Sequence, residues 1–160
     1  MADQNTLNYT EQGGANTVIG GTLTLGATAL TASGAELNAL AAAPLDVDIV
    51  VGSIAGDVIN VTLQLNDADG AALATRASVF AYLSDDANGD SVAGTAPTGG
   101  VAVGTDGLAI PLVADKAFLL VSEADGDIDL DVEDSGADTW YLIVVLPNGK
   151  LVASDAITIA

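Results

Sequence analysis

The chain has 160 residues, of which 22 are acidic and only three are basic, so its formal net charge is −19. Such a charge repels phosphate backbones and anionic lipid, so nucleic acid and membranes are not expected as partners. The sequence has no His and no Cys, which removes the usual general bases, thiolate nucleophiles and soft metal ligands, as well as any disulfide framework.

The N-terminal part of the chain is polar and rich in Gly. Residues 1–15 carry Leu7 and Tyr9 as large apolar side chains in an otherwise polar segment, which predicts a flexible arm. Such an arm either becomes ordered on a partner or is a frayed terminus, and the sequence leaves both open. Within residues 16–31, Thr and apolar residues alternate over 22–25 after the pair Gly20-Gly21, which predicts one or two short strands that need neighbours or other subunits for stability. The apolar residues of these strands include Val18, Ile19, Leu23 and Leu25.

A short helix is predicted next. Ser33 and Glu36 have the spacing of a capping box, in which each side chain satisfies a backbone N–H of the other residue. We expect the helix to extend to residue 43, because the following proline disfavours further helical turns. Its apolar residues Leu37 and Leu40 must dock on something, since a helix this short is marginal alone. The partner surface is either the core of the same chain or another subunit.

Seven short strands are predicted in the rest of the chain, after a connecting segment over residues 45–56. They cover residues 57–66, 77–84, 108–113, 117–122, 127–132, 139–146 and 151–159. Short strands separated by turn residues over about one hundred positions are typical of an immunoglobulin-like sandwich. The chain is therefore predicted to be mainly β, with an N-terminal arm, short strands and one short helix before an antiparallel β-sandwich over residues 57–160.

Two of these strands carry distinctive patterns. In the strand at 127–132 the carboxylates Asp127, Asp129 and Asp131 alternate with Ile128, Leu130 and Val132. Strict alternation predicts a buried aliphatic face and an acidic outer face. The strand at 139–146 is apolar at both odd and even positions, which predicts a central strand covered on both sides.

Few residues fit a chemical site. Ser84, Asp86, Asn88 and Gly89 occupy positions 1, 3, 5 and 6 of a calcium-binding loop, but position 12 is Thr95 rather than a bidentate Glu. Asp86 and Asn88 are therefore only weak calcium candidates, since Asp, Asn and Gly also form ordinary turns. Exposed carboxylates on a strand lack the burial that a general acid needs. We expect no catalytic residue, no cofactor and no enzymatic activity.

Two groups of segments resemble tailed-bacteriophage capsid decoration (cement) or head-fibre proteins. The first group is NYTEQGG at 8–14, TVIGGTL at 17–23 and LTASGAELN at 30–38. The second group is similar to β-sandwich modules of phage structural proteins, and comprises VTLQLNDADG at 61–70, AYLSDD at 81–86, GTDG at 104–107 and WYLIVVLPNGK at 140–150. The similarity covers most of the chain.

The resemblance implies a structural virion protein, commonly a homotrimer, on the outer surface of the capsid. Residues 1–15 would be a capsid-binding arm, residues 16–56 an anchoring and oligomerisation segment, and the sandwich would be displayed outward. The partners implied are the major capsid protein and other copies of this chain. The expected capsid contacts are Leu7, Tyr9, Val18, Ile19, Leu23 and Leu25, and the expected contacts between subunits are Leu37 and Leu40.

Other functions remain open for the same fold. The sandwich could instead be a tail-fibre module or an adhesin that binds a receptor or glycan through a loop such as residues 85–100. A calcium-dependent adhesin of a cell surface would gain thermal stability when calcium is added. A carbohydrate-active enzyme is the least favoured alternative, because an exposed acidic face offers no raised carboxyl pKa and no aromatic sugar platform.

Overall fold

The computed structural model describes residues 8–10, 17–19, 24–25, 28–29, 31–41 and 43–160. The chain divides into two compact units, residues 1–38 and residues 39–160. In the N-terminal unit β1 (Asn8–Thr10) pairs antiparallel with β2 (Thr17–Ile19), and β3 (Thr24–Leu25) pairs antiparallel with β4 (Thr28–Ala29). One or two short strands were expected over residues 16–31, and the structure has three there. Strand β1 was not predicted and lies in the segment that was expected to be a flexible arm.

Helix α1 (Gly34–Ala41) begins with the predicted capping box. The backbone N–H of Ser33 donates to Glu36 Oε2 at 2.7 Å, and the backbone N–H of Glu36 donates to Ser33 Oγ at 3.2 Å. The Ser33 hydroxyl also donates to Glu36 Oε2 at 2.7 Å. The two bonds that the carboxylate accepts lower the pKa of Glu36, the Ser33 hydroxyl contributing most. The helix ends two residues earlier than expected.

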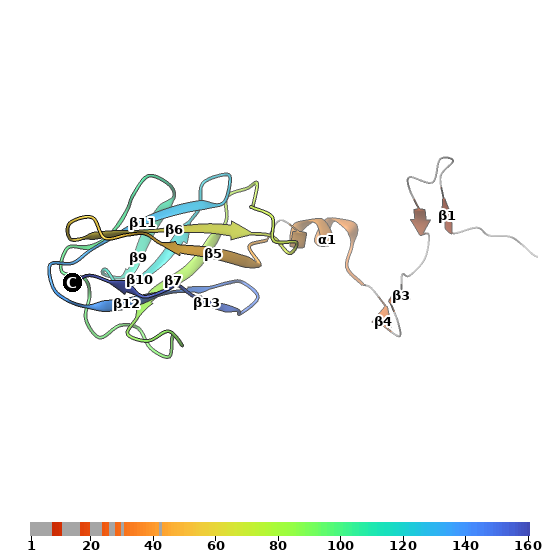
Figure 1. The fold of residues 1–160 in the computed structure, drawn as a ribbon. Coiled ribbons are helices and arrows are strands. Elements are labelled where there is room, and N and C mark those ends of the chain that lie inside the picture. The colour runs from red at the N-terminus through yellow and green to blue at the C-terminus, as the bar shows by residue number, and fades with distance from the viewer. Residues whose placement is uncertain (1–7, 11–16, 20–23, 26–27, 30, 42) are drawn as a thin grey trace, which may run out of the picture. The chain divides into compact units, whose positions relative to one another are not determined.

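Two antiparallel sheets form the larger unit and pack face to face as a β-sandwich (Figure 1). The first sheet has the order β5 (Asp46–Val51), β6 (Val58–Asn66), β11 (Asp127–Glu133), β8 (Gly100–Val103). The second has the order β13 (Leu151–Ala153), β12 (Thr139–Val145), β7 (Ser78–Ser84), β10 (Ala117–Val121), β9 (Leu108–Val113), and β14 (Ile157–Thr158) also pairs with β12. The predicted mainly β sandwich is confirmed.

The connectivity follows the immunoglobulin pattern at the centre of both sheets. Strands β5-β6-β11 have the order of immunoglobulin strands A-B-E, and β13-β12-β7 have the order of G-F-C. Strand β8 extends the first sheet beside β11, while the β9–β10 hairpin extends the second sheet beside β7. The additions make both sheets wide enough to present a broad outer face.

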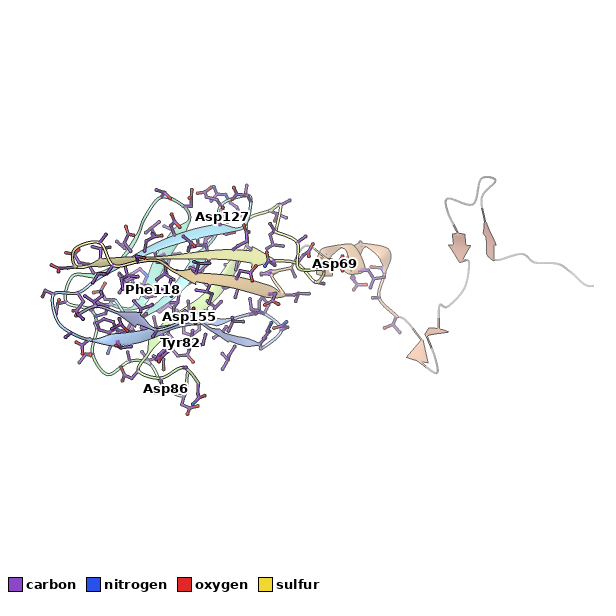
Figure 2. The ribbon with its side chains drawn as sticks, viewed as in Figure 1. Asp69, Tyr82, Asp86, Phe118, Asp127 and Asp155 are labelled. Atoms are coloured by element: carbon purple, nitrogen blue, oxygen red, sulfur yellow. The ribbon has the colours of Figure 1, made fainter. Side chains whose placement is uncertain are left out.

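The core lies between the two sheets, where alternate residues of each strand meet. On β11 the aliphatic residues are buried, with Ile128 and Leu130 at 0% exposure, which confirms the predicted alternation. Trp140 of β12 is 1% exposed, and its indole Nε1 donates to the carbonyl of Thr95 at 3.3 Å. Phe118 of β10 fills the space between the sheets (Figure 2). Because β12 pairs on both sides, the prediction of a central strand is also confirmed.

Three details of the sandwich differ from the sequence prediction. Residues 45–56 are not merely a connection, since they contain β5, which pairs with β6 over its whole length. Strand β8 was not predicted. The last predicted strand is divided into β13 and β14. Ile143 of β12 pairs with Ala153, and Trp140 pairs with Ile157, so a shift of three residues on β12 corresponds to a shift of four on the partner strand. One extra residue therefore forms a bulge in this edge strand.

Candidate functional surfaces

The proposed capsid contacts fall mainly on the two N-terminal hairpins. Tyr9 lies on β1 opposite Val18 on β2, and Ile19 is the next residue of β2. Leu25 lies on β3. The remaining two candidates, Leu7 and Leu23, lie outside the described residues. The structure thus brings three of the six candidates together in one hairpin.

The proposed contacts between subunits, Leu37 and Leu40, both lie on α1. The side chain of Leu37 is 40% exposed. An exposed leucine on a two-turn helix is compatible with docking on a partner surface, and the assignment of both residues stays a prediction.

The outer face of the first sheet carries the predicted acidic ladder. Asp127, Asp129 and Asp131 are half-buried and lie opposite the polar residues of β6. Asn60 Nδ2 donates to Asp131 Oδ1 at 2.9 Å, and Thr105 Oγ1 donates to Asp129 Oδ2 at 2.5 Å. Amide and hydroxyl donors are therefore placed between like charges, which reduces the cost of gathering them on one face.

The surroundings of Asp127 disfavour its ionised form. Burial raises the pKa of the Asp127 carboxyl, and the nearby carboxylates of Asp125, Asp106 and Asp129 raise it further. Together with Asp48, three of these four acids line a shallow hollow at the sheet surface: Asp106, Asp127 and Asp129. Among the described residues, no group of three or more His, Cys, Asp or Glu side chains has a metal-binding arrangement.

The weak calcium candidates belong to a tight turn. Asp86 Oδ1 accepts the backbone N–H of Asn88 at 2.8 Å and that of Gly89 at 3.1 Å. This is an Asx turn, in which the carboxylate organises its own loop. Ser84, the first position of the presumed calcium loop, is fully buried. The geometry at Asp86 and Asn88 is thus that of turn formation.

Residues 85–99 form a long loop that is hydrogen-bonded to β7 of the second sheet and, at its end, to the residue that follows β11. Tyr82 Oη donates to the carbonyl of Gly89 at 2.5 Å, and the backbone N–H of Ala93 donates to the carbonyl of Leu83 at 2.7 Å. At the end of the loop, Asp134 Oδ1 accepts both the backbone N–H and the hydroxyl of Thr98 at 2.8 Å. These bonds lower the pKa of the Asp134 carboxyl, the backbone donor contributing most.

The loop covers part of an apolar outer face that sequence reasoning missed. Tyr82, Ala117 and Ile143 point away from the main core and are nevertheless buried, at 8%, 3% and 1% exposure. Burial raises the pKa of the Tyr82 phenol, and Asp86 and Asp90 raise it further. Figure 2 shows Tyr82 and Asp127 on opposite sides of the sandwich. The sequence feature that could have predicted this face is the presence of apolar residues at both odd and even positions in strands such as Leu108–Val113.

Comparison of the chain with protein-family models and with curated proteins found no match. Within the part of the chain that the structure describes, no helix has the length and apolar character needed to cross a membrane.

Proposed function

We propose that this chain is a non-enzymatic structural virion protein that binds the outer surface of a capsid through its N-terminal region. Its partners are the major capsid protein and other copies of itself, as a homotrimer, and it decorates or stabilises the shell. The observation that carries this proposal is the division of the chain into an N-terminal unit of short hairpins and a separate sandwich with its own core.

The N-terminal unit suits attachment because its strands are two or three residues long. Strand pairs of this size bury too little surface to be stable alone, so a neighbouring protein surface would contribute to their stability. Their free edges can add to the edge of a capsid-protein sheet by β-augmentation. Several copies bound at symmetric positions would then reinforce the shell through many weak contacts rather than one strong contact.

The sandwich suits display in a crowded layer. Its first sheet carries carboxylates along the strands β5 and β11. A net charge far from zero keeps neighbouring molecules soluble and apart, which benefits a protein present at high local density.

Co-sedimentation with capsids that lack this protein tests the proposal. The full chain is compared with a chain lacking residues 1–25 and with Val50→Asp, a change at a residue 61% exposed on the sandwich. We expect saturable binding by the full chain and by Val50→Asp, and loss of binding on truncation. If the intact, folded chain does not sediment with capsids, the proposal is wrong. Binding to host cells instead would favour the tail-fibre or adhesin function.

A further inference from the structure

Charged residues are distributed unequally between the two sheets. The strands of the first sheet contain two carboxylates on β5 and four on β11. The strands of the second sheet, β13, β12, β7, β10, β9 and β14, contain no charged residue at all. The first sheet therefore has an acidic outer face, and the strands of the second sheet present an uncharged one, which we call the neutral face. Carboxylates reach the neutral face only from loops, such as Asp86 and Asp90 beside Tyr82.

The neutral outer face contains a continuous apolar row across five strands. The register makes the following residues successive partners from β13 to β9: Leu151, Val145, Phe80, Leu119 and Ile110. We call these five residues the apolar row. Leu151 is 50% exposed and Ile110 is 43% exposed. The loop at residues 85–99 covers the adjacent row through Tyr82 and leaves the apolar row accessible.

Both edges of this sheet are poorly suited to strand addition, so a partner would contact the face instead. The edge at β13 and β14 is interrupted by the bulge between them. Strand β9 forms the other edge and has Pro111 in its middle. Proline has no N–H to donate to an added strand, and natural sheets use it to block edge pairing. Exposed apolar side chains on a face, in contrast, gain free energy when another apolar surface covers them.

Charge identifies the partner that fits this face. Two of the three basic residues are engaged within the chain, since Arg76 pairs with Glu123 and Lys150 Nζ lies 2.8 Å from Asp46 Oδ1. Two copies of a chain with a charge of −19 repel each other wherever carboxylates face carboxylates. Contact through the neutral faces avoids this. The two acidic faces would then be separated by three sheet spacings of about 10 Å each, well beyond a Debye length of about 8 Å.

We propose that copies of this chain associate through the apolar row, with the neutral faces turned toward one another and the acidic faces outward. Two copies face to face satisfy this arrangement, as do three copies around a threefold axis. The row and its flanks extend over about 24 Å by 15 to 20 Å from strand and residue spacings, which is about half of a standard interface. Association through the face alone is therefore weak and depends on concentration. The inference rests on the self-association that the proposed function includes and names the surface that carries it, but it needs no capsid.

Sedimentation equilibrium of the full chain from micromolar to millimolar concentration tests the inference. We expect reversible association, which Ile110→Asp weakens by about tenfold or more in dissociation constant because it buries a charge in the contact. The matched control is Val50→Asp, which places the same charge on an exposed apolar residue of the first sheet, 61% exposed against 43% for Ile110. A chain that stays monomeric throughout contradicts the inference, and so does an equal effect of the two substitutions.

Cross-linking gives a second measurement that does not depend on a disruptive change. Because the chain has no Cys, a single introduced cysteine reports on its own position alone. We expect Leu119→Cys, near the middle of the apolar row, to cross-link between copies with a short bismaleimide, and Val50→Cys to remain monomeric. Cross-linking at Val50→Cys but not at Leu119→Cys would place the contact elsewhere and overturn the inference. Capsid binding is measured separately by co-sedimentation, so a failure of this contact surface is distinguishable from a failure of capsid attachment.

Discussion

Leu130 provides a direct test of where the core lies. It is fully buried on β11 and pairs with Val61 of β6 on one side and with Val103 of β8 on the other. Leu130→Ala removes three carbon atoms and leaves a cavity that strands on both sides hold open. We expect a loss of about 3 kcal/mol in the free energy of unfolding, within the usual range of about 2 to 5 kcal/mol for such a change.

The expected change in melting temperature follows from the size of the unit. For a sandwich of about 120 residues the entropy of unfolding is about 0.25 kcal/mol per degree, so the melting temperature falls by about 12 °C. Urea and thermal unfolding, followed by circular dichroism, measure both quantities. Asp129→Asn is the matched control, because it changes the preceding residue on the opposite face, and we expect it to alter stability by less than about 0.5 kcal/mol. A loss below about 1 kcal/mol for Leu130→Ala, or equal losses in both variants, would refute the assignment of β11 to the core.

Three further predictions concern the loop and the carboxylates. Gly89→Ala should destabilise the sandwich by about 1 to 2 kcal/mol, since Gly89 has φ of +71° and a Cβ there would lie 3.0 Å from Tyr82 Oη. The control is Gly70→Ala, where φ is +77° and the space around the residue is open. It should reduce stability less in the same thermal unfolding assay. Asp134→Asn should destabilise the protein at pH 7, because the pKa of the carboxyl is lowered in the folded state. In urea unfolding over a pH series, the difference in stability between the two proteins should shrink as the pH falls below the unfolded-state pKa of about 3.9. A difference that does not depend on pH would contradict the prediction. Asp127→Asn should instead stabilise the protein at pH 7, because the raised pKa means that folding disfavours the ionised carboxylate. The gain in stability should vanish below about pH 3.9 in the same pH series. Destabilisation at pH 7 would contradict a raised pKa of Asp127.

Strands with strict alternation were predicted well, while strands that depend on their neighbours were not. The alternation in β6 and β11 is local, so it is visible in the sequence and determines which face is buried. Strand β5 ends in three consecutive apolar residues, Ile49, Val50 and Val51, which interrupt the alternation. Its hydrogen-bonding partner is the neighbouring strand β6. Strand β8 has only four residues and begins at a glycine with φ of +90°. Neither has enough local signal to be separated from a loop.

The apolar outer face was harder to predict because it is created by contacts distant in sequence. The sequence places Phe80, Leu119 and Val145 in three separate strands, and only their register makes them neighbours. The covering loop is equally non-local, since a Cβ at Gly89 would lie 3.1 Å from atoms of Ile143. The capping box and the Asx turn at Asp86, by contrast, each join residues at most three positions apart, and both correspond to local sequence patterns.

The absence of charge from the second sheet is a property of the sheet and not of one region of the chain. Its strands are drawn from residues 78–84, 108–121 and 139–158, and the acidic strand β11 lies between two of these segments. The six strands themselves, without the turns between them, comprise 30 residues, among which the overall charged fraction of 16% would place about five charges. Burial explains the lack of charge on the inner face but not on the outer one, where Leu151 and Ile110 remain exposed. A face kept both neutral and apolar in so acidic a chain indicates a surface that is covered when the protein is assembled.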